Sequence, residues 1–295
     1  MTTTDQERVA DRLLRSTANV GYDPDIDVDW SAPLEPGKRY VLPHRSSLYG
    51  TRLFDQLTPE QQIELGKHEI VSVASTGIFL ESVLMRMLAK HAYWGEVTSN
   101  HIQYALAELG EETRHTIMFA KMIERLGTPR YGPPKVILRM GAALTAMAFG
   151  PSMWGAILIG EEIVDRLQRE IVGDPSMQPL VRMISRIHIV EEARHVGFAR
   201  AELLRSVMKM NKFARAYHRI ALARTAFIVS RLMINPRVYA AVGLNPRVAR
   251  RTALANPYYQ ETLRYGGEKL VAFLTEAGLI GRPGRTLWRK SFLLG

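Results

Sequence analysis

A five-residue motif occurs twice in this chain, 80 residues apart. Residues 111–115 read Glu-Glu-Thr-Arg-His and residues 191–195 read Glu-Glu-Ala-Arg-His, so Glu112 is paired with His115 and Glu192 with His195. On a helix, side chains at positions i and i+3 lie on one face, so each copy can offer a carboxylate and an imidazole to the same metal ion. Two such helices facing each other predict a bundle that holds a pair of metal ions.

The remaining pattern is that of a helical protein. Thr58-Pro59 begins a predicted helix that runs to about residue 90, and Thr98 or Ser99 caps a second helix that ends at Gly127. A third covers 135–172 with an interruption near Gly150-Pro151, and a fourth covers 176–210. Shorter helices are predicted over 6–16, 213–234, 236–242, 246–255 and 268–277, and no segment alternates like a strand.

These segments predict an all-α fold, a ferritin-like four-helix bundle with additional C-terminal helices. Residues 1–57, rich in Pro, Gly and Asp, form an N-terminal arm, and residues 58–295 form one domain. Within that domain we expect the bundle core over about 58–210 and a C-terminal helical extension over 211–295.

The stretch from Gly141 to Gly160 carries no charge and has the length of a membrane span. Its internal Gly-Pro and the Glu161-Glu162 that follows favour a fully buried core helix, so we do not expect membrane insertion. The apolar side chains on and beside it are expected to pack in the core, or else to line an apolar pocket: Met140, Met147, Met153 and Trp154.

Composition narrows the chemistry. The chain has no Cys, so a metal must be held by oxygen and nitrogen ligands, and disulfides and iron–sulfur clusters are excluded. No apolar signal segment stands at the N-terminus, which favours a cytoplasmic protein. Residues 200–295 hold 18 Lys and Arg against 4 Glu, a net +14 that leaves −4 for the first 199 residues. We interpret this as a solvated basic face, not a nucleic-acid surface, because the arginines are scattered singly.

The two remaining helices of such a bundle each supply one inward carboxylate. Glu81 lies on the apolar stripe of the first helix, where an acid is costly to bury unless it binds a cation. On the third helix, Glu161 shares a face with apolar residues and is preferred, with Glu162 as the alternative.

His188 stands four residues before Glu192 and seven before His195, so all three point in nearly the same direction. We therefore predict that His188 is a further metal ligand. Glu108, at the equivalent place on the second helix, and Asp165 are predicted to accept hydrogen bonds from the ligating imidazoles.

Taken together, these residues resemble the non-haem diiron arylamine N-oxygenases, the p-aminobenzoate N-oxygenase family. The resemblance covers about residues 60–210, and the His four before the last Glu is its distinguishing feature. It implies a homodimer with seven metal ligands, two iron ions and O2 as co-substrate, which oxidises an aryl amine to hydroxylamine and nitro products. By position the ligands are Glu81, Glu112, His115, Glu161 (or Glu162), His188, Glu192 and His195.

Several points stay open at this stage. Electrons must come from an external donor, because the sequence has no flavin or iron–sulfur motif. Manganese in one of the two positions, a hydroxylase or desaturase acting on carbon, and a ferritin-like metal-binding protein without oxygenase activity are the alternatives.

Overall fold

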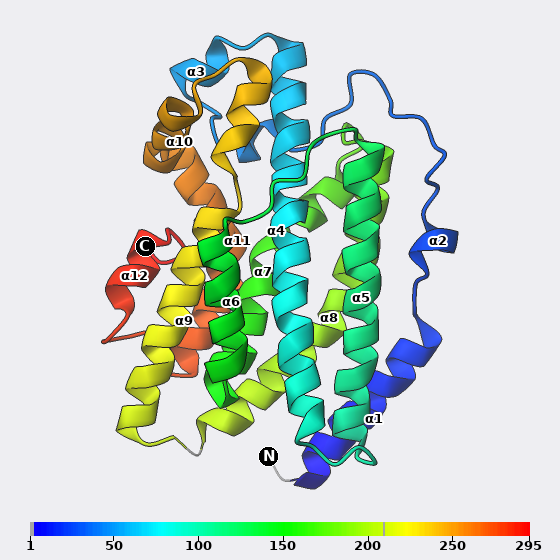
Figure 1. Ribbon diagram of the computed structural model, residues 1–295, viewed down its shortest axis with the longest axis vertical. Coiled ribbons are helices and arrows are strands. Elements are labelled where there is room, and N and C mark those ends of the chain that lie inside the picture. Colours follow the sequence, from blue (N-terminus) through cyan, green and yellow to red (C-terminus); the bar gives the residue numbers. More distant parts are fainter. Residues whose placement is uncertain (1–2, 209) are drawn as a thin grey trace.

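The computed structural model describes residues 3–208 and 210–295, and these form an all-α protein (Figure 1). Within this part of the chain the strand-like pairing is a single isolated bridge between Arg39 and Met177. The helices are α1 Thr3–Asn19, α2 Pro24–Asp27, η1 Pro43–Arg45, α3 Arg52–Asp55, α4 Pro59–Tyr93, α5 Asn100–Arg125, α6 Lys135–Met147, α7 Gly150–Gly173, α8 Pro179–Val207, α9 Lys212–Leu232, η2 Pro236–Val242, α10 Pro246–Ala255, α11 Pro257–Glu276 and α12 Arg285–Lys290. The predicted all-α class is confirmed.

The four longest core helices, α4, α5, α7 and α8, form the bundle (Figure 1). Short connections join α4 to α5 and α7 to α8, so each pair runs antiparallel and packs closely. The predicted helix starts are confirmed: Thr58 and Gln61 form a reciprocal capping box, and the Ser99 side chain accepts from the backbone N–H of Ile102. These caps fix where α4 and α5 begin, and so fix the register of the residues they carry inward.

The uncharged stretch is divided between two helices with different surroundings. Gly150 has φ +46°, and with Pro151 it separates α6 from α7. The predicted interruption near Gly150-Pro151 is confirmed, and the expectation of a fully buried helix is correct for α7, which buries Met153 and Trp154. It is wrong for α6, which packs only one side against α4, through Gly141 beside Phe79, and exposes Met140 and Met147 to solvent.

The arm and the C-terminal extension cover the outside of the bundle. Helix α1 packs against α5 and α8, α9 and α11 pack against α7, and α12 packs against α9. Helix α11 begins eleven residues before the predicted start, because Asn256 is its N-cap and accepts from the backbone N–H of Tyr258, with Pro257 in the first turn. Helix α12 was not predicted. The predicted segment 236–242 is a 3-10 helix.

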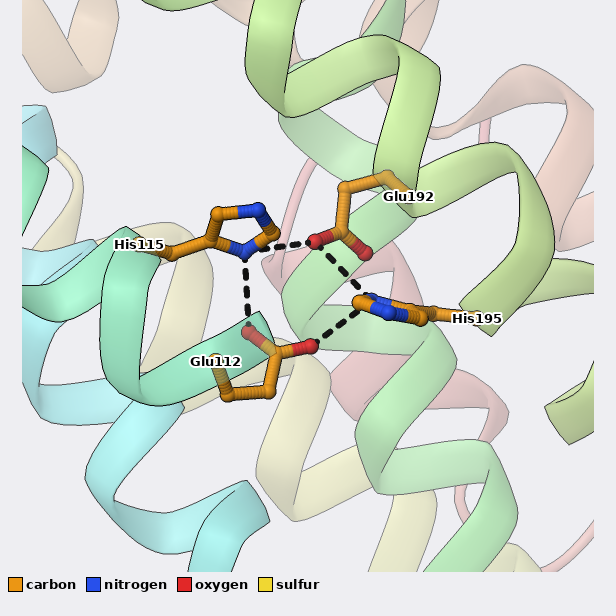
Figure 2. Close-up of side chains that lie close together, drawn as sticks. All are labelled: Glu112, His115, Glu192 and His195. Carbon is orange, nitrogen blue, oxygen red and sulfur yellow. Dashed lines mark hydrogen bonds and ion pairs between the residues drawn. The ribbon is translucent and has the colours of Figure 1, made fainter. Parts of the chain in front are cut away.

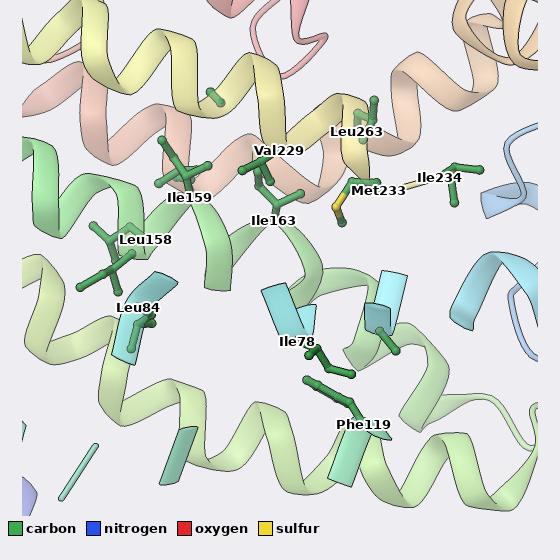
Figure 3. Packing of buried hydrophobic residues seen from close by; sticks show 14 of the residues in the cluster. Ile78, Leu84, Phe119, Leu158, Ile159, Ile163, Val229, Met233, Ile234 and Leu263 are labelled. Carbon is green, nitrogen blue, oxygen red and sulfur yellow. The ribbon is translucent and has the colours of Figure 1, made fainter. Parts of the chain in front are cut away.

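Buried apolar side chains from the bundle and the extension join in one core (Figure 3). Ile159 and Ile163 of α7 lie beside Val229 of α9 in this core, and Phe119 of α5 lies near Ile78 of α4. One core helix, α4, is long and apolar enough by length and composition to cross a membrane, and 56% of its most apolar window is buried inside the protein. Burial on this scale is what a central bundle helix requires.

Candidate metal centre

The centre of the bundle holds a cluster of carboxylates and imidazoles in three overlapping groups. In each group the possible ligand atoms lie within 4.8 Å of one another. The groups are Glu112, His115, Glu192 and His195; Glu81, His115 and His188; and Glu161, His188 and Glu192. Every member is buried. The four core helices thus bring the seven predicted ligand positions together, with Glu161 and not Glu162 among them.

The two repeated motifs form the base of this cluster (Figure 2). The Nδ1 atom of His115 lies 3.1 Å from Glu112 Oε2 and 3.2 Å from Glu192 Oε1. The Nδ1 atom of His195 lies 2.8 Å from Glu112 Oε1 and 3.2 Å from Glu192 Oε1. Each carboxylate therefore faces both imidazoles, as bridging carboxylates do in a two-metal site.

His188 faces the same cluster from one helical turn away. Its Nε2 atom lies 3.7 Å from Glu81 Oε1 and 3.6 Å from Glu192 Oε1, too far for a hydrogen bond. Its Nδ1 atom lies 3.0 Å from the side-chain oxygen of Gln168, which fixes the N–H on Nδ1 and leaves the Nε2 lone pair facing the carboxylates. Gln168 was not among the residues predicted from the sequence to support the site.

The choice between Glu161 and Glu162 follows from their partners. Glu162 points to the other side of α7, where its carboxylate forms a bidentate ion pair with Arg200 of α8. Glu161 is the member of the pair that joins His188 and Glu192. Glu161, which amphipathicity favoured, thus lies in the cluster, and the Arg200 partner that occupies Glu162 was not visible in the sequence.

A second layer of hydrogen bonds crosses between the two motifs. Glu111 Oε2 lies 2.6 Å from Nε2 of His195, and Glu191 Oε2 lies 2.8 Å from Nε2 of His115. The first Glu of each motif therefore holds the imidazole of the other motif. Arg194 donates to Glu111 at 2.7 Å and balances its charge.

This second layer differs from the prediction. Asp165 does not support an imidazole in the described structure, because its carboxylate accepts hydrogen bonds from Arg169 one turn further along α7. Glu108 is fully buried beside the cluster, but neither of its oxygens has a hydrogen-bond partner among the described residues. The sequence did carry a sign that Glu111 and Glu191 matter, because the repeat covers the whole Glu-Glu-x-Arg-His motif and not only its Glu-x-x-His part.

The donor set fits a pair of divalent cations. Three atoms that face the cluster have no hydrogen-bond partner among the described residues, although each is buried: Glu81 Oε2, Glu192 Oε2 and His188 Nε2. Buried polar atoms of this kind are costly unless something satisfies them. Four carboxylates also match the charge of two divalent ions, and mixed oxygen and nitrogen ligands suit iron or manganese.

Burial and neighbouring charges shift the pKa values of the carboxylates and imidazoles in the cluster. Burial and the Glu192 charge act to raise the pKa of Glu112, but His195 and His115 lower it to about 2. Burial opposes charge on His115, yet its carboxylate partners raise its pKa well above the usual value. Burial raises the pKa of Glu81 well above normal. Metal binding must therefore release protons from these groups.

A cavity opens on one side of the cluster. It lies between α4, α5, α7 and α8 and has a volume of about 50 Å³. Glu81, Glu161 and His188 lie in its wall, and the remaining lining is mostly apolar, with Phe119 and Met122 of α5 opposite. The predicted alternative that Met140 and Met147 line a pocket is wrong, because both are exposed on α6.

Comparison with known proteins identifies relatives over almost the whole chain. The family model described as p-aminobenzoate N-oxygenase AurF matches residues 3–278. Uncharacterized proteins of Mycobacterium tuberculosis and Mycobacterium bovis are 27% identical over 289 residues, which cover 94% of this chain and 84% of each relative.

Solved structures share the fold. An R2-like ligand-binding oxidase with an aerobically reconstituted metal cofactor aligns with a TM-score of 0.52 at 14% identity, covering 94% of this chain and 93% of that one. A variant of such an oxidase with a Mn/Fe cofactor aligns with a TM-score of 0.51 at 15% identity, covering 94% of both chains. At these identities the likeness shows a common all-α, ferritin-like fold.

Proposed function

The chain belongs to the p-aminobenzoate N-oxygenase AurF family, and on that premise we propose that it holds two iron ions and oxidises the nitrogen of an arylamine with O2. Membership makes it a dimetal oxygenase, and the choice of iron and of nitrogen as the atom oxidised is our proposal. The observation that supports it best is the convergence of four carboxylates and three imidazoles with unpartnered buried atoms.

The residues that would hold the metals are Glu81, Glu112, His115, Glu161, His188, Glu192 and His195. When bound, the metal pair would supply electrons for reducing O2 at a site closed to bulk water. Glu111 and Glu191 keep the N–H of His195 and His115 on Nε2, so both Nδ1 lone pairs face the cluster. Gln168 does the same for Nδ1 of His188, which frees Nε2.

His188 adds a third nitrogen donor on the side of the cavity. Burial lowers the pKa of His188 to about 4, so the imidazole is neutral near pH 7 and can act as a ligand without losing a proton. An amine in the cavity would approach the cluster past His188, Glu81 and Glu161. We also propose an external electron donor, a homodimer and a cytoplasmic location, which follow from the sequence analysis.

The test is anaerobic reconstitution of the purified protein with Fe(II), followed by metal counting and by exposure to O2, a reductant and a panel of arylamines. We expect about two iron ions per chain and hydroxylamine or nitro products detected by mass spectrometry. Binding of fewer than about two ions at saturation would contradict the dimetal site. Full loading with oxidation only at carbon, or with no turnover of any amine, would contradict N-oxygenation.

Two substitutions separate the site from its surroundings. His188→Ala removes a proposed ligand and should lower both the metal content and turnover. Glu162→Gln changes a buried carboxylate that faces Arg200, so it should retain both. Equal losses in the two variants would contradict the assignment of ligands.

A further inference from the structure

The cavity beside the cluster lies between two neighbouring cavities, and all three are lined by residues of α4 and α7. On one side it shares Ile70, Val73, Val164 and Met233 with a second cavity of about 90 Å³. On the other side it shares Leu80, Gly160 and Glu161 with a smaller cavity of about 30 Å³. The two larger cavities therefore adjoin across a shared wall and together extend from the cluster along α4, and we call this pair of cavities the α4/α7 channel.

The length of this channel follows from the helix that lines it. Its wall along α4 extends from Glu81 at the cluster to Ile70 and Glu69 at the far end. At a rise of about 1.5 Å per residue, the eleven steps from residue 81 to residue 70 span roughly 16 Å. A single benzene ring would fill less than half of that distance, so the channel fits an elongated molecule.

The charge of the lining is unusual for a site that would bind an anion. The cavity next to the cluster has no Lys or Arg among its described lining residues, while Glu81 and Glu161 face into it. Its other polar groups are uncharged, among them Gln168, Ser185 and Thr76.

The nearest cation along the channel is already paired. Arg45, in the wall of the second cavity, forms a bidentate ion pair with Glu170 at 2.8 Å for both contacts, and its guanidinium lies 4.0 Å from the ring centroid of Tyr265. Burial raises the pKa of Glu69, at the same end, to about 7, although hydrogen bonds from Ser47 oppose the shift. A carboxylate in the channel would therefore be desolvated without a free cation to meet it.

From this lining we propose that the channel binds an uncharged, elongated, largely apolar amine, with its amino group at the cluster and its apolar tail between Val73, Val164 and Met233. The inference rests on the proposed function for the position of the amino group, and it adds the class of substrate. It distinguishes this chain from an enzyme that acts on an anion such as p-aminobenzoate, the compound in the name of the family model.

Binding can be measured without turnover, in full-length protein loaded anaerobically with Zn(II), which cannot transfer electrons to O2. The probes are 4-butylaniline, 4-aminobenzamide and 4-aminobenzoate, titrated by calorimetry. We expect 4-butylaniline to bind on the order of 100-fold more tightly than 4-aminobenzoate, with 4-aminobenzamide in between because it is polar but uncharged. Equal or tighter binding of 4-aminobenzoate would overturn the proposal.

A matched pair of substitutions tests which arm holds the tail. Val73→Phe narrows the junction between the two larger cavities, whereas Val83→Phe makes the same change on the same helix in the smaller cavity beyond the cluster. We expect Val73→Phe to weaken binding of 4-butylaniline at least tenfold and to leave aniline unaffected, and Val83→Phe to change neither. The opposite pattern, or equal effects, would contradict the placement.

The outcomes separate this proposal from the function on which it rests. Zn(II) counting in the same samples reports the dimetal site independently of ligand binding. A protein that holds about two ions and binds none of the neutral amines contradicts the channel proposal alone. A protein that binds 4-butylaniline tightly but holds fewer ions contradicts the dimetal site and leaves the substrate class supported.

Discussion

The crossed hydrogen bonds between the two motifs lead to a quantitative prediction for Glu111→Gln. In the structure Glu111 accepts from Nε2 of His195 at 2.6 Å and from Arg194 at 2.7 Å, and both contacts are charge-assisted. The amide keeps the shape but loses the negative charge that makes the His195 imidazole a stronger donor to a metal. Substitution of such outer partners typically weakens metal affinity about 10- to 100-fold, equal to about 1.4 to 2.7 kcal/mol.

The assay is competition for Mn(II) or Fe(II) against a chromophoric chelator under anaerobic conditions. Glu191→Gln, which affects His115 in the same way, should give a loss of similar size. Glu162→Gln is the control, since it is the same chemical change in another buried ion pair, with Arg200. It should lower thermal stability and leave the metal dissociation constant unchanged. Wild-type affinity in Glu111→Gln, within about twofold, would refute the argument, as would an equal loss in the control.

Four further predictions concern stability and pH. An added Cβ at Gly266 would lie 2.4 Å from the backbone oxygen of Ile163, so Gly266→Ala should cost about 1–3 kcal/mol in urea unfolding, whereas Gly197→Ala, with no atom within 4 Å, should be neutral or stabilising. Burial raises the pKa of Glu69 from 4.5 to about 7, so its contribution to the free energy of unfolding is full below pH 4.5 and is lost as pH rises to 7. Glu69→Gln should therefore reduce the fall in the free energy of unfolding between pH 4.5 and 8 by about 3 kcal/mol. An unchanged dependence on pH would contradict this. Thr58→Ala removes the capping box of α4 and should cost about 1 kcal/mol by thermal melting, with no change in metal content. Metal affinity should fall as pH is lowered, because protons compete for His115 and His195, whose pKa values are raised; a pH-independent dissociation constant would contradict the ligand assignment.

The parts of the site that the sequence predicted are those with local periodic signals. Glu112 and His115 share a helical face by spacing alone, and a lone acid on an apolar stripe identified Glu81. The parts that it did not predict depend on contacts between helices. Whether Glu162 points away depends on Arg200 of another helix, and the role of Gln168 depends on where α7 lies beside His188.

The same distinction applies to the fold. Helix boundaries with a capping residue, such as Thr58 and Ser99, could be read directly. The environment of α6 could not be predicted from the sequence, because α6 is as apolar as α7. Only the packing of α6 against α4 decides which of its residues stay exposed. The start of α11 at Pro257 was missed although Asn256 precedes it, because the aromatic pair after it does not show a clear helical period.

The exchange of partners between the motifs makes each half of the centre incomplete by itself. His115 of α5 depends on Glu191 of α8, and His195 of α8 depends on Glu111 of α5. If one helix were shifted along the other by a single turn, both imidazoles would lose these hydrogen bonds, so a wrong register between α5 and α8 would cost two contacts at once. Anyone transplanting this chemistry into a designed scaffold would have to carry over both helices as one block, with their relative register preserved.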